Sequence, residues 1–91
     1  MSILNKTKIK QIASSHGAFN VRLFGSVARG DETKDSDVDM LVDMEPGRSL
    51  FDLMMLKEEL EEELGRRVDI VTEKSLNRHI KEKILLEAIT L

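Results

Sequence analysis

Three aspartates interrupt apolar stretches of the chain that are predicted to be strands. Asp37 and Asp39 flank Val38, and Asp69 lies inside a later apolar run. Alternate residues of a strand share a face, so both acids of the first pair would project the same way while Val38 enters the core. Neighbouring carboxylates repel one another unless a cation lies between them, and such hard oxygen ligands suit Mg²⁺ or Mn²⁺. Together the three acids predict a divalent-metal site, whereas each acid alone is equally consistent with a solvent-facing strand position.

A glycine–serine pair forms the second candidate element. Gly25 and Ser26 follow a predicted strand and precede a short helical turn that runs through Arg29. Glycine lets the backbone approach a ligand closely, and the start of a helix presents free N–H groups. The Ser26 hydroxyl adds a donor and Arg29 adds a cation. The arrangement predicts a site for the triphosphate of a nucleotide, with an ordinary strand-to-helix turn as the alternative.

The spacing of these elements is more specific than any of them alone. Gly25-Ser26, ten residues, Asp37-x-Asp39 and a third aspartate on a later strand resemble the signature of the DNA polymerase β-like nucleotidyltransferase superfamily. The longer match, FGSVARGD at 24–31 and SDVDMLV at 36–42, resembles the minimal nucleotidyltransferase family over nearly the whole chain. The resemblance implies a polymerase β-like nucleotidyltransferase core and a single minimal domain over 1–91. That domain would lack the second domain with which larger relatives grip the base and the acceptor.

The resemblance also implies a role for each motif residue. Asp37 and Asp39 would bind both of two Mg²⁺ ions, and Asp69 would complete the site of one ion beside the attacking oxygen. Gly25, Ser26 and Arg29 would hold the triphosphate. Attack of an acceptor hydroxyl on the α-phosphorus would then transfer a nucleoside monophosphate and release pyrophosphate, so that Asp37, Asp39 and Asp69 are the expected catalytic residues.

By the same resemblance, the expected partner is a HEPN-domain toxin. ATP would be the donor and a toxin tyrosine the acceptor, so that AMP transfer silences the toxin. The sequence contains no tyrosine, which excludes tyrosine self-modification. Two alternatives stay open: a nucleotidyltransferase subunit acting on a small-molecule acceptor, and a non-catalytic adaptor that neutralises its partner by binding.

Composition narrows the class of protein further. The chain has 91 residues, a net charge of −3 and 41% hydrophobic residues, with three phenylalanines as its aromatics. This acidic balance argues against direct nucleic-acid binding. The absence of cysteine excludes thiolate metal sites. No membrane span or signal-peptide core is evident, so a cytoplasmic protein is expected. A domain this small often depends on a partner, and homo- or hetero-oligomers are both compatible with it.

Hydrophobic periodicity predicts the elements that must position these residues. They are a helix capped by Ser2 and ending at Gly17, strands over 21–24, 38–43 and 67–72, a helical turn to Arg29, a turn over 45–48, a helix from Ser49 to Gly65 and a helix over 75–89. Asp52 lies three residues after Ser49, in the spacing of a capping box. The order predicts an α/β (α+β) fold in which a small mixed β-sheet is packed with helices.

Apolar residues at helical spacing predict which helix faces are buried. The expected positions are Ile9, Ile12 and Ala13 in the first helix, Leu50, Leu53, Met54, Lys57, Leu60 and Leu64 in the long helix, and Leu76, Ile80, Ile84 and Ala88, with Leu85 and Ile89 beside them, in the last.

Other polar residues are interpreted without a ligand role. His16 and His79 lack the spacing of a metal pair and are expected at a helix end and on a helix surface. Arg67 would share a face with Asp69 in a regular strand, but a solvated turn is the favoured interpretation. The acidic run over 58–63 is expected to be a solvated helix face.

Overall fold

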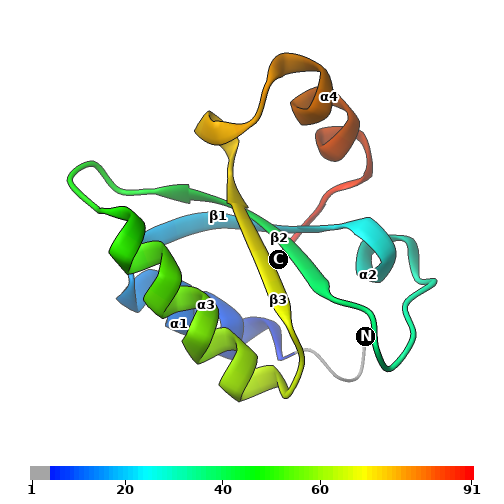
Figure 1. Ribbon diagram of the computed structural model, residues 1–91, viewed down its shortest axis with the longest axis horizontal. Helices are drawn as coiled ribbons and strands as arrows, with labels where there is room; N and C mark the ends of the chain where they lie inside the picture. Colours follow the sequence, from blue (N-terminus) through cyan, green and yellow to red (C-terminus); the bar gives the residue numbers. More distant parts are fainter. Residues whose placement is uncertain (1–4) are drawn as a thin grey trace.

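The computed structural model describes residues 5–91 as four helices and one 3₁₀ turn around a single sheet (Figure 1). The elements are α1 (Lys6–Ser15), β1 (Ala18–Phe24), α2 (Gly25–Arg29), β2 (Val38–Met44), α3 (Leu50–Leu64), β3 (Val68–Thr72), η1 (Glu73–Ser75), α4 (Arg78–Glu87) and β4 (Ile89–Thr90).

The sheet is mixed, as the sequence predicts. Its strand order is β3-β2-β1-β4. β1 pairs antiparallel with β2 and with β4, whereas β2 and β3 are parallel. Parallel neighbours need a crossover connection, and α3 supplies it between β2 and β3. The expected α/β fold with a small mixed sheet is confirmed.

One face of the sheet carries the hydrophobic core. α1 and α3 lie side by side on that face, and α4 lies on the opposite side of the sheet (Figure 1). Val38, Met40 and Val42 of β2 are at most 1% exposed and belong to the core under the two helices. Because side chains alternate along a strand, Asp39 and Leu41 point to the α4 side.

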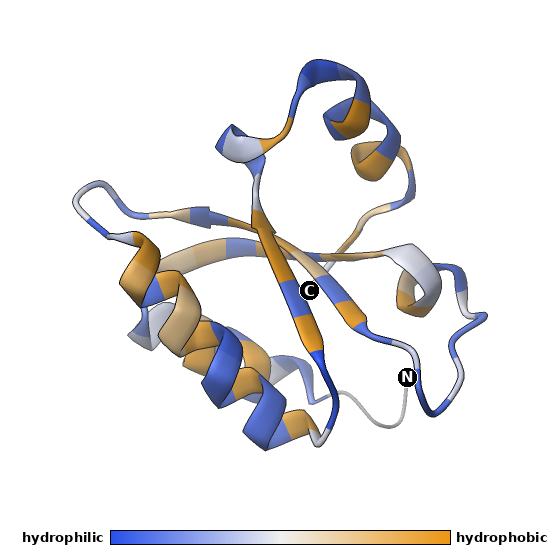
Figure 2. Cartoon of the chain, viewed as in Figure 1, coloured by the Kyte–Doolittle hydropathy of each residue, from blue (hydrophilic) through white to orange (hydrophobic). Residues whose placement is uncertain are grey.

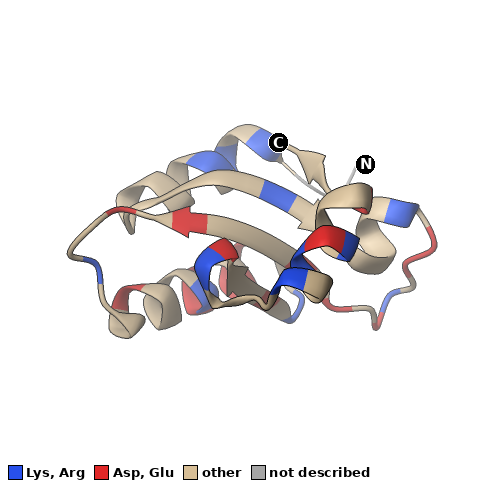
Figure 3. Ribbon diagram, turned by 90° about the horizontal axis from the view of Figure 1, so that it is seen from above, with Lys and Arg blue, Asp and Glu red and all other residues tan. Residues whose placement is uncertain are grey.

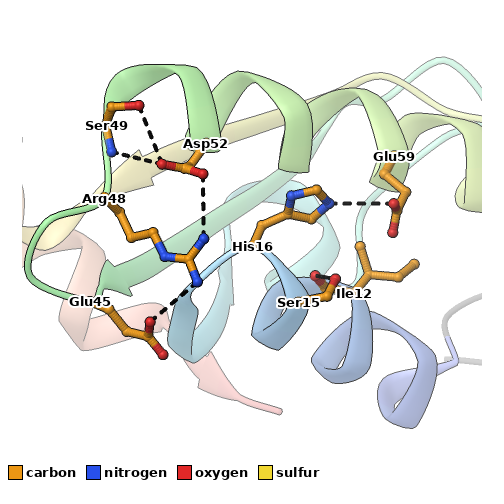
Figure 4. A network of polar contacts seen from close by, with 8 residues as sticks. All are labelled: Ile12, Ser15, His16, Glu45, Arg48, Ser49, Asp52 and Glu59. Carbon is orange, nitrogen blue, oxygen red and sulfur yellow. Dashed lines mark hydrogen bonds and ion pairs between the residues drawn. The ribbon is translucent and has the colours of Figure 1, made fainter.

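Helix α3 begins and ends where the sequence predicts, after Ser49 and before Gly65. The Asp52 carboxylate accepts the Ser49 N–H at 2.8 Å, which is the backbone part of the expected capping box (Figure 4). The predicted apolar stripe is partly wrong. Leu56 is fully buried although it was not among the expected positions, whereas Leu50 and Met54 are more than half exposed.

Leu50 and Met54 stay exposed because only one narrow face of α3 packs against the core. The side chains that reach the core are Leu53, Leu56, Leu60 and Leu64, spaced three, four and four residues apart. That row is one face of a helix, and it meets the sheet near the edge strand β3. Apolar residues one row away therefore stay in solvent.

Helix α1 buries Ile9, Ile12 and Ala13 as predicted. It begins at Lys6, where the Asn5 side chain accepts the N–H of Lys8 at 3.0 Å. Ser2, the predicted cap, lies outside the described residues. His16 ends the helix, and its Nε2 lies 3.3 Å from Glu59 Oε1, which joins α1 to α3 (Figure 4).

The predicted helix over 75–89 is too long at both ends. The chain instead forms η1, a shorter α4 capped by Asn77, and the strand β4. Ala88 leaves the helix with ψ 140°, after which Ile89 and Thr90 pair with the free edge of β1. Unpaired strand edges attract any segment that can complete their hydrogen bonds. The expected apolar stripe is partly right: Leu76, Ile84 and Ala88 are half-buried, whereas Ile80, Leu85 and Ile89 are exposed and no residue from Arg78 to Glu87, all of them described, is fully buried.

Candidate nucleotidyl-transfer site

Two of the three predicted acids lie next to each other on adjacent strands. Asp39 of β2 is the register partner of Asp69 of β3 in the parallel pair, so their side chains share a face of the sheet. Hydrophilic positions interrupt the apolar colour of both strands (Figure 2). The face is the one opposite the core, on which α4 lies. Asp69 is exposed and Asp39 is half-buried.

The charge environment of Asp39 is unfavourable for a carboxylate. Burial raises its pKa above the ordinary 3.8, and the charges of Asp69, Asp37 and Glu87 raise it further, whereas Arg29 lowers it. A cation bound among these oxygens would remove the repulsion. The carboxylate donors and their mutual repulsion therefore fit the divalent ion that the sequence predicts.

Asp37 lies immediately before β2 and has a partner of its own. Its Oδ1 is 3.0 Å from Nε of Arg67. Arg67 lies in the loop before β3 with its side chain 78% exposed, which agrees with the solvated turn that the sequence favours, and it pairs with Asp37 and not with Asp69. Within residues 5–91 no three His, Cys, Asp or Glu side chains lie close enough together to hold a metal ion. A metal bound by all three acids would thus require their side chains to move closer together than they are in this arrangement.

The Gly25–Ser26 turn lies directly against these acids. Phe24, the last residue of β1, is the register partner of Asp39, so the turn begins beside that carboxylate. Gly25 has φ +73°, and a Cβ at this position would overlap Oδ2 of Asp39. Only glycine permits both the backbone conformation and the close approach. The structure thus brings the two predicted motifs together.

Arg29, at the end of α2, faces the same region. Its guanidinium lies 3.3 Å from Asp31 Oδ2 and 3.3 Å from Glu87 Oε2. Both carboxylates raise the pKa of Arg29, Asp31 more than Glu87. The guanidinium remains half exposed and is available to an anionic ligand.

Glu87 is the residue of this region that sequence reasoning missed. It is the last residue of α4, and its Oε1 accepts the Gly25 N–H at 2.8 Å. The two residues are 62 positions apart, and Glu87 was only one polar position of a predicted helix end. No local signal connects them, since the contact depends on where β4 joins the sheet.

The site is open to solvent. The Asp37 side chain is 45% exposed and Asp69 is also exposed. A groove of about 680 Å³ lies elsewhere, lined among others by Phe19, Met44, Leu50, Leu53, Glu73 and Lys81, and none of the three acids borders it. Acceptor groups could therefore reach the acids directly from outside the molecule.

A mixed sheet with paired carboxylates against a glycine–serine turn is the arrangement that the resemblance implies for a nucleotidyltransferase. The model of the family described as "Nucleotidyltransferase domain" matches residues 6–91. The chain belongs to this family, in its minimal form, and the expected resemblance is confirmed.

Individual relatives agree with this assignment. The chain is 45% identical over 84 residues to MJ0435 of Methanocaldococcus jannaschii, assigned as a protein adenylyltransferase, covering 92% of this chain and 90% of that protein. It is 38% identical over 97 residues to the protein adenylyltransferase MntA of Thermococcus cleftensis, covering 98% of each. A solved structure assigned as a minimal nucleotidyltransferase superposes with a TM-score of 0.87 at 49% identity, covering 94% of this chain and 88% of that one.

A further solved structure, a toxin–antitoxin with AMP-PNP, shares the fold with a TM-score of 0.83 at 22% identity and covers 96% of this chain and 72% of that one. Among the helices described for this chain, none combines the length and the apolar composition needed to cross a bilayer. Figure 3 shows that Lys and Arg positions are interspersed with Asp and Glu positions along the chain.

Proposed function

We propose that this chain is a Mg²⁺-dependent protein adenylyltransferase that transfers AMP from ATP to a tyrosine hydroxyl of a partner HEPN-domain toxin. The observation that carries the proposal is the placement of Asp39 beside Asp69 and against the Gly25–Ser26 turn. Support for a protein acceptor comes from the relatives named as protein adenylyltransferases. The fold shared with a chain of a toxin–antitoxin crystallised with AMP-PNP supports ATP as the donor and a toxin as the partner.

Different residues would bind the nucleotide, hold the metal ion and accept the proton in nucleotidyl transfer. Gly25 would let the backbone approach the triphosphate closely, and Ser26 and Arg29 would bind it by hydrogen bonding and by charge. Asp37, Asp39 and Asp69 are the residues that would hold Mg²⁺, which when bound neutralises negative charge on the phosphoryl oxygens. The acceptor oxygen would bond to the α-phosphorus while the bond from that phosphorus to pyrophosphate breaks. Asp69, which is exposed, would accept the hydroxyl proton.

Two features of the chain favour an acceptor on another molecule. The acids lie at an open surface, and the sequence contains no tyrosine. The acceptor hydroxyl must then be presented by a partner whose own surface completes the site and excludes water. Because ATP is the proposed donor, the proposed place of action is the cytoplasm.

The test is a transfer assay with the protein encoded next to this chain. The two proteins are incubated with labelled ATP and Mg²⁺, and the intact mass of each is measured. We expect the neighbour to gain one or more AMP units. Asp39→Ala should abolish the gain. The matched control is Asp35→Ala, an exposed aspartate in the loop before β2, which should leave transfer unchanged.

The other outcomes identify the alternatives. If the wild type binds the neighbour tightly without transferring AMP, and this binding survives Asp39→Ala, the chain is a non-catalytic adaptor and not an enzyme. Transfer to small hydroxyl compounds but not to the neighbour would indicate a nucleotidyltransferase subunit with a small-molecule acceptor.

A further inference from the structure

Helix α4 is held to the rest of the protein by polar contacts. None of its residues from Arg78 to Glu87, all described, is buried. Near its start, Lys81 Nζ lies 3.1 Å from Oε1 of Glu73, whose Oε2 is 3.0 Å from Arg22 of β1. At its end, Glu87 reaches α2. The helix therefore gains little stability from apolar burial, and its position depends on these contacts and on the pairing of β4.

The Glu87 carboxylate makes a specific set of contacts at the candidate nucleotide site. Its Oε1 accepts the Gly25 N–H at 2.8 Å. Nη1 of Arg29 lies 3.3 Å from Oε2 and 3.5 Å from Oε1. One side chain thus contacts both the glycine of the turn and the cation that follows it by four residues.

The Gly25 turn needs an acceptor at this point. The first N–H groups of a helix have no partner within the helix, and Gly25 opens α2. The turn also holds Gly25 at φ +73° against Asp39, so a small displacement would change the space beside that carboxylate. The side chain that caps the turn is itself fixed, because Ile89, two residues after Glu87, pairs with Leu23 of β1.

We infer that Glu87 is a positioning residue of the nucleotide site: its carboxylate fixes the Gly25–Ser26 turn and orients Arg29 for the triphosphate. The inference rests on the proposed function for its ligand, but the contact itself is independent of it. Because the Gly25 N–H is hydrogen-bonded to Glu87, it is not available to a ligand. The phosphates would then be bound by Ser26 and by the Arg29 guanidinium.

The alternative interpretation of the Glu87 contact predicts a different effect on ATP binding. A carboxylate that merely occupied the place of a phosphate would compete with ATP, and removing its charge would strengthen nucleotide binding. A positioning carboxylate behaves differently, because glutamine can still accept the Gly25 N–H through its amide oxygen whereas alanine cannot. The two substitutions at one position therefore separate the readings.

The experiment combines NMR and calorimetry on the whole chain. Wild type, Glu87→Ala, Glu87→Gln and the control Glu82→Ala are compared. Glu82 lies on the same helix in an exposed pair with Arg78. Amide exchange and chemical shift of Gly25 and Ser26 are measured without ligand. Binding of a non-hydrolysable ATP analogue with Mg²⁺ is then measured by calorimetry.

We expect Glu87→Ala to accelerate exchange at Gly25 and to weaken analogue binding about tenfold, as for the loss of one hydrogen bond to a charged group. Glu87→Gln should weaken binding less than Glu87→Ala, because it keeps the acceptor of the Gly25 N–H although its amide NH₂ group replaces the oxygen that Arg29 faces, and Glu82→Ala should match wild type in both measurements. Unchanged Gly25 exchange in Glu87→Ala, or tighter binding in both Glu87 variants, would overturn the inference. If the wild type binds no analogue, the proposed function fails, and the Gly25 amide alone decides whether Glu87 fixes the turn.

Discussion

The carboxylate of Asp39 lies among the acidic side chains of Asp37, Asp69 and Glu87. The positive charge of Arg29 offsets part of their electrostatic repulsion. Such a concentration of negative charge opposes folding, since each ionised group raises the free energy of its neighbours. The same concentration attracts a cation. Asp39 is therefore a residue at which function and stability conflict, and substitution should reveal both sides of that conflict.

Replacing Asp39 with asparagine should abolish AMP transfer and stabilise the fold near neutral pH. The folded protein holds the Asp39 proton more tightly than the unfolded chain, because its pKa is raised above 3.8. Stability from this group is consequently present at low pH and lost as the pH rises through the folded pKa. We expect a gain of up to about 1 kcal/mol, allowing for solvent screening, or a Tm up to about 4–8 °C higher. Thermal unfolding at several pH values measures it, and an advantage that persists below pH 3.8 would contradict this origin.

Gly25→Ala should destabilise the protein and prevent transfer. Alanine at φ +73° is strained by about 1–2 kcal/mol, and its methyl group would displace the Asp39 carboxylate. Gly47→Ala is the matched control, since Gly47 has φ +86° but nothing lies within 4 Å of the added methyl group. Gly25→Ala should lose more stability in urea unfolding than Gly47→Ala, because the overlap with Asp39 adds to the same backbone strain, and only Gly25→Ala should lose activity. Equal activity in the two variants would show that the contact with Asp39 is unimportant.

At the scale of elements, the ends of α3 follow from local residues and its orientation does not. Ser49, Asp52 and Gly65 are sufficient to predict where the helix begins and ends, because capping contacts involve near neighbours in sequence. Which of its apolar residues are buried depends on the strand that the helix covers. Leu50 and Met54 are as hydrophobic as Leu56, but Leu56 lies in the row that faces the sheet.

Leu56→Ala should therefore be far more destabilising than a truncation next to it. Leu56 is 0% exposed, and emptying such a site costs about 2–5 kcal/mol, a large part of the stability of a small domain. Met55, its neighbour on the same helix, is 45% exposed, so Met55→Ala should change stability by only about 0.5 kcal/mol. Urea unfolding followed by circular dichroism compares the two. Similar midpoints would mean that α3 packs on the sheet through a different face.

For the molecule as a whole, sequence reasoning succeeded where contacts are short-range or where a motif fixes them. The glycine–serine turn and Asp39 were predicted to act together, and the pairing of β1 with β2 brings them into contact. The contacts of Glu87 with Gly25 and of Arg67 with Asp37 were not predicted. Both depend on how distant strands join the sheet, and no periodicity within either segment encodes that.

Helix α4 should open in local fluctuations that leave the rest of the fold intact. No residue from Arg78 to Glu87, all within the described chain, is buried, whereas α3 places Leu56 and Leu60 in the core. Segments with few buried apolar contacts exchange their amides at free energies below that of global unfolding. We expect α4 amides to exchange faster than those of α3 by hydrogen-exchange NMR.

The same experiment at high salt identifies what holds α4 in place. Screening shortens the Debye length from about 10 Å at 0.1 M to about 3 Å at 1 M, which weakens exposed ion pairs. Lys81–Glu73 and Arg29–Glu87 connect the two ends of α4 to its neighbours, so 1 M NaCl should speed α4 exchange and leave α3 unchanged. Glu73→Gln should act like salt because the pairing with Lys81 and Arg22, which lowers the pKa of Glu73, needs its charge. Equal protection of α4 and α3 at both salt concentrations would show that α4 is part of the cooperative core and that its polar contacts are incidental.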